Sequence, residues 1–161
     1  MAVIAPQSTI TRPANTTAYT AADLVANDTT AGNVTPFEWS LQGLGRGGIL
    51  RRVRITKSAT SATNANFNLH LFDASPTVAN GDNGALSVST NADTFLGTVA
   101  LDATSGGLAG ASSSLTDVSG ALEIPLYKPT TGGKVYGLLA AAAGYTPASG
   151  ETFKIVLEIE G

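Results

Sequence analysis

Apolar and polar residues alternate, or form short apolar runs between turn residues, in seven segments of the chain. In the last segment, Phe153, Ile155 and Leu157 would point to one side of a strand, whereas Lys154 and Glu158 would point to the other. A period of two residues is typical of a strand with one buried and one solvated face. The sequence therefore predicts strands over residues 35–41, 48–56, 65–72, 94–101, 121–127, 134–142 and 152–160.

Glycine-rich turns separate these segments, as in residues 80–84 and 130–133, because glycine adopts the backbone conformations that a tight turn requires. Charged residues make up only 13% of the chain, and small residues replace the Glu, Lys and Arg that long helices favour. A length of 161 residues suits one compact domain. We expect an all-β fold, an antiparallel β-sandwich that is jelly-roll-like.

The start of the chain differs in composition from the rest. Pro6 and Pro13 favour extended backbone, and few apolar side chains are present there to anchor the segment in a core. We interpret residues 1–18 as an extended N-terminal arm or an edge strand, and residues 19–161 as a single β-sandwich domain.

Three regions have weaker patterns. Residues 19–25 fit either one short helical turn, with Thr20 as its cap, or a link between two strands. Residues 88–103 and 108–119 contain long tracts of Ser, Thr, Gly and Ala, so we assign much of both regions to surface loops.

Net charge and cysteine content limit the classes of function. The formal net charge is −3, whereas nucleic-acid-binding proteins are usually basic, so no nucleic-acid partner is expected. The chain has no Cys and therefore no disulfide or thiolate metal site. Its most apolar window, residues 135–145, is too short for the roughly 20 residues of a membrane-spanning helix, so no membrane partner is expected. The first residues do not resemble a secretory signal, and we expect the chain to stay in the cell that makes it.

Positive charge is concentrated in one predicted strand. Five of the nine Lys and Arg residues lie within residues 46–57, although the whole chain is mildly acidic. Strict alternation would place Leu50, Arg52 and Arg54 on one face, and Arg51 in an apolar row on the other. Two interpretations stay open: a salt-sensitive patch that binds carboxylates of another protein, and a solvated face whose isolated ion pairs contribute about 0–1 kcal/mol each.

Other candidate sites have simpler explanations. The glycine-rich residues 43–48 lead into a strand and lack the Lys-Ser/Thr ending of a phosphate-binding loop. A set of acidic and amide side chains could surround a hard cation, but their spacing does not match a calcium loop, and Asp-Asn-Gly is typical of a hairpin turn. The members of this set are Asp73, Asp82, Asn83 and Asp93.

The usual catalytic groups are scarce. His70 alternates with Leu69 and Leu71 in a predicted strand, and no second His or any Cys completes a metal site or a triad. Glu158 and Glu160 share a strand face, and because nothing suggests a cleft around them we interpret them as solubilising charge. The sequence predicts a protein that is not an enzyme and that uses no cofactor, no metal and no small-molecule substrate.

Phe37 and Trp39 alternate along the predicted strand 35–41. An exposed aromatic pair on a β-sandwich can stack against a sugar ring, whereas packing in the core explains the pair more simply in a chain with one Trp. Carbohydrate binding, by a binding module or a tail-tip adhesin, is therefore the alternative function.

Three blocks of sequence resemble a known family. They are residues 11–19 (TRPANTTAY), 47–57 (GGILRRVRITK) and 67–76 (FNLHLFDASP), the last followed by Asp-Asn-Gly at 82–84. Together they resemble virion structural proteins of tailed bacteriophages, in particular small head decoration or cement proteins, and the likeness is best over residues 9–101. The resemblance implies a β-sandwich outside the icosahedral shell, often in a trimer, with an extended terminal segment that grips neighbouring capsid subunits.

We therefore expect a virion structural protein that decorates and stabilises the outer surface of the capsid through protein–protein contacts. The resemblance implies the major capsid protein and further copies of this chain as partners, a homotrimer being favoured, in a virion assembled in the cytoplasm of the host bacterium. A neck or tail location stays open. The partner-binding residues that we expect are Arg12, Arg46, Arg51, Arg52, Arg54 and Lys57.

Overall fold

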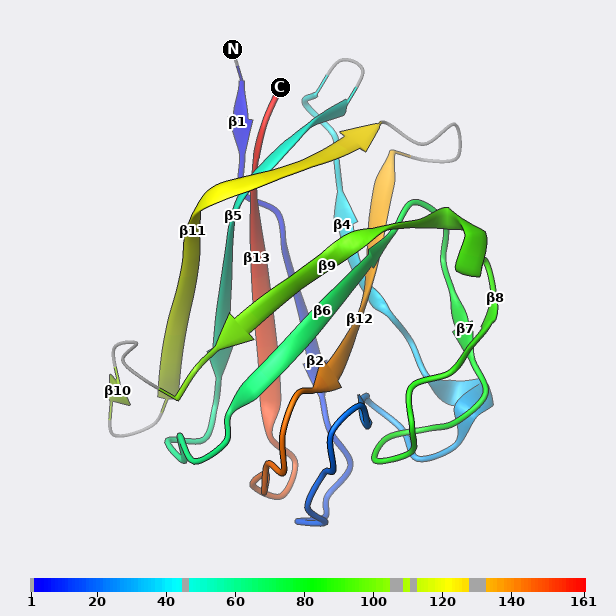
Figure 1. Ribbon diagram of the computed structural model, residues 1–161, viewed down its shortest axis with the longest axis vertical. Helices are drawn as coiled ribbons and strands as arrows, with labels where there is room; N and C mark the ends of the chain where they lie inside the picture. The colour runs from blue at the N-terminus through cyan, green and yellow to red at the C-terminus, as the bar shows by residue number, and fades with distance from the viewer. Residues whose placement is uncertain (1, 45–46, 105–108, 111–112, 128–132) are drawn as a thin grey trace.

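A computed structural model of the chain describes residues 2–44, 47–104, 109–110, 113–127 and 133–161. Two antiparallel sheets pack against each other as a β-sandwich, with short 3-10 turns as the only helical elements in these ranges (Figure 1). The all-β fold class predicted from the alternation is confirmed. None of the helical turns in the part of the chain described is long and apolar enough to cross a membrane.

The first sheet has the strand order β1, β13, β5, β11 and β10, and β2 also pairs with β13. The long strands β5 and β13 lie side by side at its centre. The bounds of its strands are β1 (Val3–Ile4), β2 (Gln7–Thr11), β5 (Gly47–Lys57), β10 (Ala109–Gly110), β11 (Ser113–Tyr127) and β13 (Thr152–Glu160).

The second sheet has the strand order β3, β12, β6 and β9, and β4 also pairs with β12. A separate hairpin of β7 and β8 lies beside it, and two 3-10 turns, η1 (Ala31–Asn33) and η2 (Ala92–Thr94), connect strands. The bounds of these strands are β3 (Leu24–Val25), β4 (Phe37–Ser40), β6 (Asn66–Phe72), β7 (Thr77–Val78), β8 (Val88–Thr90), β9 (Phe95–Asp102) and β12 (Lys134–Ala141).

Each of the seven predicted segments contains a strand, namely β4, β5, β6, β9, β11, β12 and β13. The assignment of much of residues 88–103 and 108–119 to surface loops is wrong, because β8 and β9 cover most of the first region and β11 covers most of the second. β11 already begins at Ser113, and Ser114 to Ser119 pair with the strand β5. Pairing in a sheet uses backbone groups, so a run of small polar residues can form a strand without an apolar pattern.

Residues 3–11, which the sequence assigned to an arm or an edge strand, run along β13. Val3 lies opposite Glu160 in β1, and Ile10 lies opposite Phe153 in β2. The side chain of Ile10 is buried in the core between the sheets. This segment is therefore an integral edge of the first sheet.

Residues 19–25 link two strands, and the helical turn that we considered for them is wrong. The backbone N–H of Tyr19 donates to the carbonyl of Tyr145 at 2.9 Å, and the chain turns at Ala22, whose φ is 71°. The backbone N–H and the hydroxyl of Thr20 donate to the carboxylate of Asp23 at 2.6 and 2.9 Å. Asp23 thus holds the turn that leads into β3.

The main core lies between the two sheets, with Trp39 near its middle. The Trp39 side chain is fully buried, stacks on Phe37 with 5.6 Å between ring centroids, and donates from Nε1 to the carbonyl of Ile155 at 3.1 Å. Gly137 of β12 makes room for this ring, because a Cβ atom there would lie 2.7 Å from it. A smaller apolar cluster lies on the outer side of the second sheet, and its buried members are Leu24, Ala26, Phe72, Val78 and Leu138.

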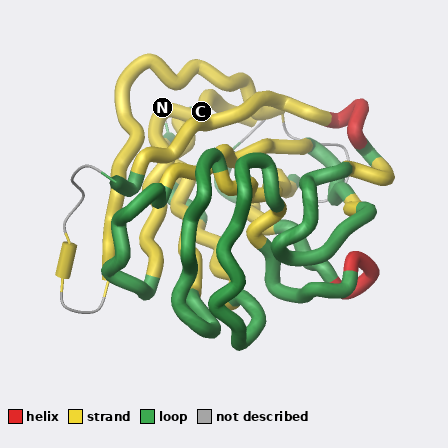
Figure 2. The backbone as a smooth tube through the Cα atoms, turned by 60° about the horizontal axis from the view of Figure 1, so that its bottom comes forward, coloured by secondary structure: helices red, strands yellow, loops and turns green. Residues whose placement is uncertain are grey.

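The loops at the lower end of Figure 1 come forward in Figure 2, where they lie beside one another. They include residues 12–23, 58–65 and 142–151, which are far apart in the sequence. Two clusters of buried charged side chains, described below, join these loops.

Candidate partner-binding face

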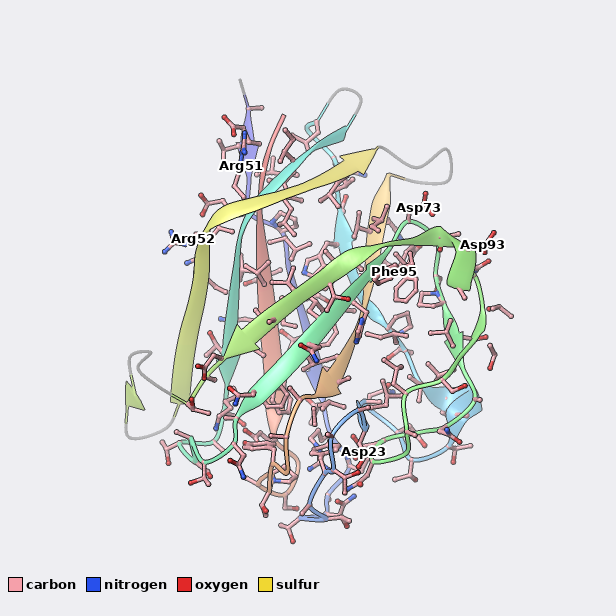
Figure 3. All side chains as sticks on the ribbon, in the orientation of Figure 1. Asp23, Arg51, Arg52, Asp73, Asp93 and Phe95 are labelled. Atoms are coloured by element: carbon pink, nitrogen blue, oxygen red, sulfur yellow. The ribbon has the colours of Figure 1, made fainter. Side chains whose placement is uncertain are left out.

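The outward side of the first sheet carries three of the six residues predicted to bind a partner, namely Arg51, Arg52 and Arg54. Arg52 lies opposite Glu158 in the paired strands β5 and β13, and Arg54 lies opposite Val156. Figure 3 shows Arg51 beside β1 and Arg52 beside β11. We call this surface the basic face; its described members are Val3, Ile49, Arg51, Arg52, Arg54, Lys154, Glu158 and Glu160.

A β-bulge interrupts the alternation in β5. Leu50 and Val53 are both fully buried although two residues separate them, and the pairing with β13 shifts between Arg52 and Leu50. A bulge adds one residue to a strand, and here Arg51 is the added residue. The prediction that Leu50 shares a face with Arg52 and Arg54 is therefore wrong, since the bulge returns Leu50 to the core.

Two ion pairs cross from β5 to β13 on the basic face. Nε of Arg51 lies 2.6 Å from Oε2 of Glu160, and Nη1 of Arg52 lies 3.8 Å from Oε2 of Glu158. All four side chains keep between 22% and 39% of their surface exposed. Partly exposed pairs of this kind contribute about 0–1 kcal/mol each. Glu158 and Glu160 thus pair with the arginines of β5, which the interpretation as solubilising charge did not include.

Arg54 and the ends of the basic face complete this surface. Nε of Arg54 is buried and has no hydrogen-bond partner among the described residues. Lys154 is exposed near one end of the face, whereas Val3 and Ile49, which are 62% and 37% exposed, lie at the other end on either side of Glu160. The face therefore combines cationic groups with an apolar end.

Arg12 lies inside the protein, away from the basic face. Its Nη2 donates to Oδ2 of Asp82 at 2.9 Å, and both side chains are fully buried. Nε of Arg12 donates to the Tyr19 hydroxyl, which in turn donates to Oδ1 of Asp82 at 2.6 Å. The same Oδ1 accepts from the backbone N–H of Ala26 at 2.9 Å. Burial and the neighbouring Asp82 raise the pKa of Tyr19, so the hydroxyl stays protonated as a donor.

Lys57 is also buried, in a second charged cluster. Its Nζ lies 3.5 Å from Oε1 of Glu151 and donates to the carbonyl oxygens of Ala59, at 2.6 Å, and Ser61. The Tyr145 hydroxyl donates to the same carboxylate, 2.8 Å from each oxygen. Burial lowers the pKa of Lys57, although Glu151 opposes this shift, and burial raises the pKa of Tyr145.

The six predicted partner-binding residues thus separate into different places. Arg12 and Lys57 are 2% and 1% exposed, so in this folded state they hold loops together and cannot contact a partner. Arg51, Arg52 and Arg54 share the basic face, where partner binding stays a prediction. Arg46 lies outside the described residues. Sequence reasoning did not single out Tyr19, Tyr145 or Glu151, because nothing in the sequence shows that these residues meet a buried cation.

The acidic set considered for a cation has other uses. Asp82 neutralises Arg12, and the Asn83 side chain donates to the carbonyl oxygens of Thr17 and Ala18 at 3.0 and 3.1 Å. Within the described ranges, His, Cys, Asp and Glu form no group of three or more that could hold a metal ion. Asp73 and Asp93 lie near each other at one corner of the molecule (Figure 3).

The remaining candidates have structural positions. Nδ1 of His70 lies 2.9 Å from the hydroxyl of Thr98 on the neighbouring strand, and burial lowers the pKa of His70. Phe37 and Trp39 are 2% and 0% exposed, so they cannot stack against a sugar from solvent. That part of the carbohydrate-binding hypothesis is wrong, because both rings point into the sandwich.

No protein-family model matches the chain, and no curated protein matches it. Among solved structures it is similar to a carbohydrate-binding module from the glycoside hydrolase family 9 protein Cel9A of Ruminococcus flavefaciens FD-1, with 12% identity over 97% of this chain and 99% of that chain and a TM-score of 0.37. It is also similar to the Tobacco streak virus coat protein, with 10% identity over 96% of this chain and 86% of that chain and a TM-score of 0.22. At these TM-scores, neither similarity bears on the function of this chain.

Proposed function

We propose that the chain is a non-enzymatic structural protein of a tailed-phage virion, which binds the outer surface of the capsid through its basic face. The sequence blocks that resemble head decoration proteins support this proposal, and so does the β-sandwich fold. The observation that carries it is the basic face itself, where Arg51, Arg52 and Arg54 lie together, each partly exposed, on the outward side of a sheet.

The basic face suits binding to an acidic protein surface. Its ion pairs are partly exposed, and the exposed side chains of Val3 and Ile49 at one end offer apolar surface that a partner can bury. The partner that the resemblance implies is the major capsid protein, contacted by several copies of this chain, with a homotrimer as the favoured assembly. Many weak contacts on a symmetric lattice hold firmly because each bound copy raises the effective concentration of the next contact.

Rebinding to capsids tests the proposal. Capsids stripped of this protein should rebind it, and the Arg52→Ser/Arg54→Ser variant should bind about 10–100 times more weakly at low salt, because it removes two cations from the face. Its affinity should also depend less on ionic strength. Binding is measured by cosedimentation with stripped capsids over a series of salt concentrations.

Lys134→Ser is the matched control. Lys134 is a half-exposed cation on the second sheet, paired with Glu38 at 2.7 Å, so its loss should leave capsid affinity unchanged. Equal affinities of the wild-type protein and the double arginine variant, with the same salt dependence, would contradict binding through the basic face. Absence of the protein from purified virions would contradict the proposed function itself.

Deletion of the N-terminal segment is a poorer test. Residues 3–11 complete the edge of the first sheet, and Arg12 is buried against Asp82. A deletion of residues 2–12 therefore removes part of the fold together with any partner contact. Single substitutions on the basic face separate the two effects.

A further inference from the structure

A hollow of about 330 Å³ lies on the outer side of the second sheet, opposite the basic face in the sandwich. Two facing rows of β6 and β9 form it: Asn66 lies opposite Asp102, and Asn68 lies opposite Ala100. Its volume falls within the range of small-molecule sites. The lining residues are Asn66, Phe67, Asn68, Ala100, Leu101, Asp102 and Ala142.

The lining of the hollow is suited to hydrogen bonds with hydroxyl groups. Asn66 and Asn68 bring amide donors and acceptors, and Asp102 brings a carboxylate that the backbone N–H and the hydroxyl of Thr104 hold in place. Oδ1 of Asn66 is a buried acceptor without a hydrogen-bond partner in the described part of the chain. Ala100 is exposed and small, which leaves room for a ligand above the sheet.

The charge around the hollow disfavours anionic ligands. None of the lining residues is Lys or Arg, and Asp102 is acidic. Asp73 and Asp93 add negative charge at the other end of β9 (Figure 3). Nucleic acids and sulfated or phosphorylated polymers would meet like charge here, whereas a neutral polyol would not.

An exposed aromatic ring lies on the same strand as the hollow. Phe95, at the start of β9, is 50% exposed, and its ring packs against Phe72 at 5.7 Å and against His70 at 6.3 Å between centroids. The strand rise places Phe95 roughly 20 Å from Asp102. An exposed ring and a hollow that combines apolar surface with amide and carboxylate groups suit a chain of several sugar rings, each with an apolar face and a rim of hydroxyls.

We propose that the outer side of the second sheet binds a neutral oligosaccharide, held by Asn66, Asn68 and Asp102 in the hollow and by Phe95 along the strand. This site differs from the aromatic pair suggested by the sequence, and it does not depend on the proposed capsid role. The two roles are compatible because the basic face and the hollow lie on opposite sides of the sandwich. A copy bound to a capsid through its first sheet would display the sugar site outwards.

Titration with neutral oligosaccharides tests the proposal. The ¹⁵N-labelled full chain is titrated separately with cello-, xylo-, manno-, malto- and N-acetylglucosamine oligomers, each up to about 10 mM. This range detects binding even when the dissociation constant is above about 1 mM. At least one oligomer should shift the amide signals of residues 66–70 and 95–102. Absence of shifts with every oligomer, or shifts confined to other strands, would overturn the proposal.

Variants locate the binding. Ala100→Arg fills the hollow and should raise the dissociation constant at least about tenfold, and Asn68→Ala should raise it about 3–10-fold. Thr9→Arg places the same side chain at an exposed strand position of the first sheet and should leave the affinity unchanged. Thermal unfolding identifies any variant that fails to fold. Equal losses of oligosaccharide affinity for Ala100→Arg and Thr9→Arg would overturn the proposal. Sulfated oligosaccharides that bind as tightly as the neutral ones would overturn it too.

Discussion

Replacement of Asp82 by alanine is expected to lower the free energy of unfolding by about 3–5 kcal/mol. The Asp82 side chain is fully buried, and its carboxylate accepts hydrogen bonds from Arg12 and Tyr19. Alanine would leave the guanidinium of Arg12 buried without its counter-ion, which is far less favourable than the intact pair. Urea denaturation followed by the fluorescence of Trp39, the single tryptophan, measures the change.

Two further variants show whether the buried charge causes the effect. Asp93→Ala removes a carboxylate from the exposed turn η2 and should change stability by no more than about 0.5 kcal/mol. Arg12→Leu/Asp82→Ala removes both charges and should be destabilised by less than the sum of the two single variants, because each single variant leaves one buried ion unpaired whereas the double variant leaves none. If Asp82→Ala were as stable as Asp93→Ala, the buried pair would have no part in holding the loops.

Replacement of Trp39 by alanine is expected to lower the free energy of unfolding by about 3–5 kcal/mol as well, for a different reason. The ring is fully buried between the sheets and stacks on Phe37, and Gly137 leaves the space that it fills. Alanine would leave a cavity that the rigid sandwich cannot close, and the carbonyl of Ile155 would lose its donor. Circular dichroism is the suitable probe, since the variant has no tryptophan.

Phe95→Ala is the matched control for the loss of an aromatic ring. Half of the Phe95 side chain is already exposed. Its removal should therefore lower the free energy of unfolding by less than about half of the loss expected for Trp39→Ala. Trp39→Phe, which keeps a ring but loses the indole N–H, should lie between the two alanine variants. Equal losses of unfolding free energy for Trp39→Ala and Phe95→Ala would show that the core around Trp39 closes the cavity without strain.

The strands could be predicted from the sequence because burial of one face imposes a visible period. In β13, Phe153, Ile155 and Leu157 are fully buried, as their alternation with polar residues indicated. In β5 the same reasoning failed at Arg51, because a bulge depends on the register with the partner strand and leaves no local pattern. Strand content is thus encoded locally, whereas register is set by pairing.

The candidate site could be predicted only in part. Arg52 and Arg54 lie, partly exposed, on the outward side of the first sheet as expected, since an outward position in a strand follows from the period. Lys57 and Arg12 belong to charged residue types that are almost never buried without a partner, so they were assigned to the surface. Their partners, Glu151 and Asp82, come from distant loops that only the folded chain brings together.

The long sequence separation of the buried ion pairs bears on when they form during folding. Arg12 and Asp82 are 70 positions apart in the sequence, and Lys57 and Glu151 are separated still further. Closing such long loops is entropically unfavourable until neighbouring strands have already met. We therefore expect the clusters to form late, after the transition state, and to secure the loops of a sandwich that has already assembled. Loss of either buried ion pair should raise the rate of unfolding and leave the rate of refolding nearly unchanged. These charges should therefore set the lifetime of the folded protein.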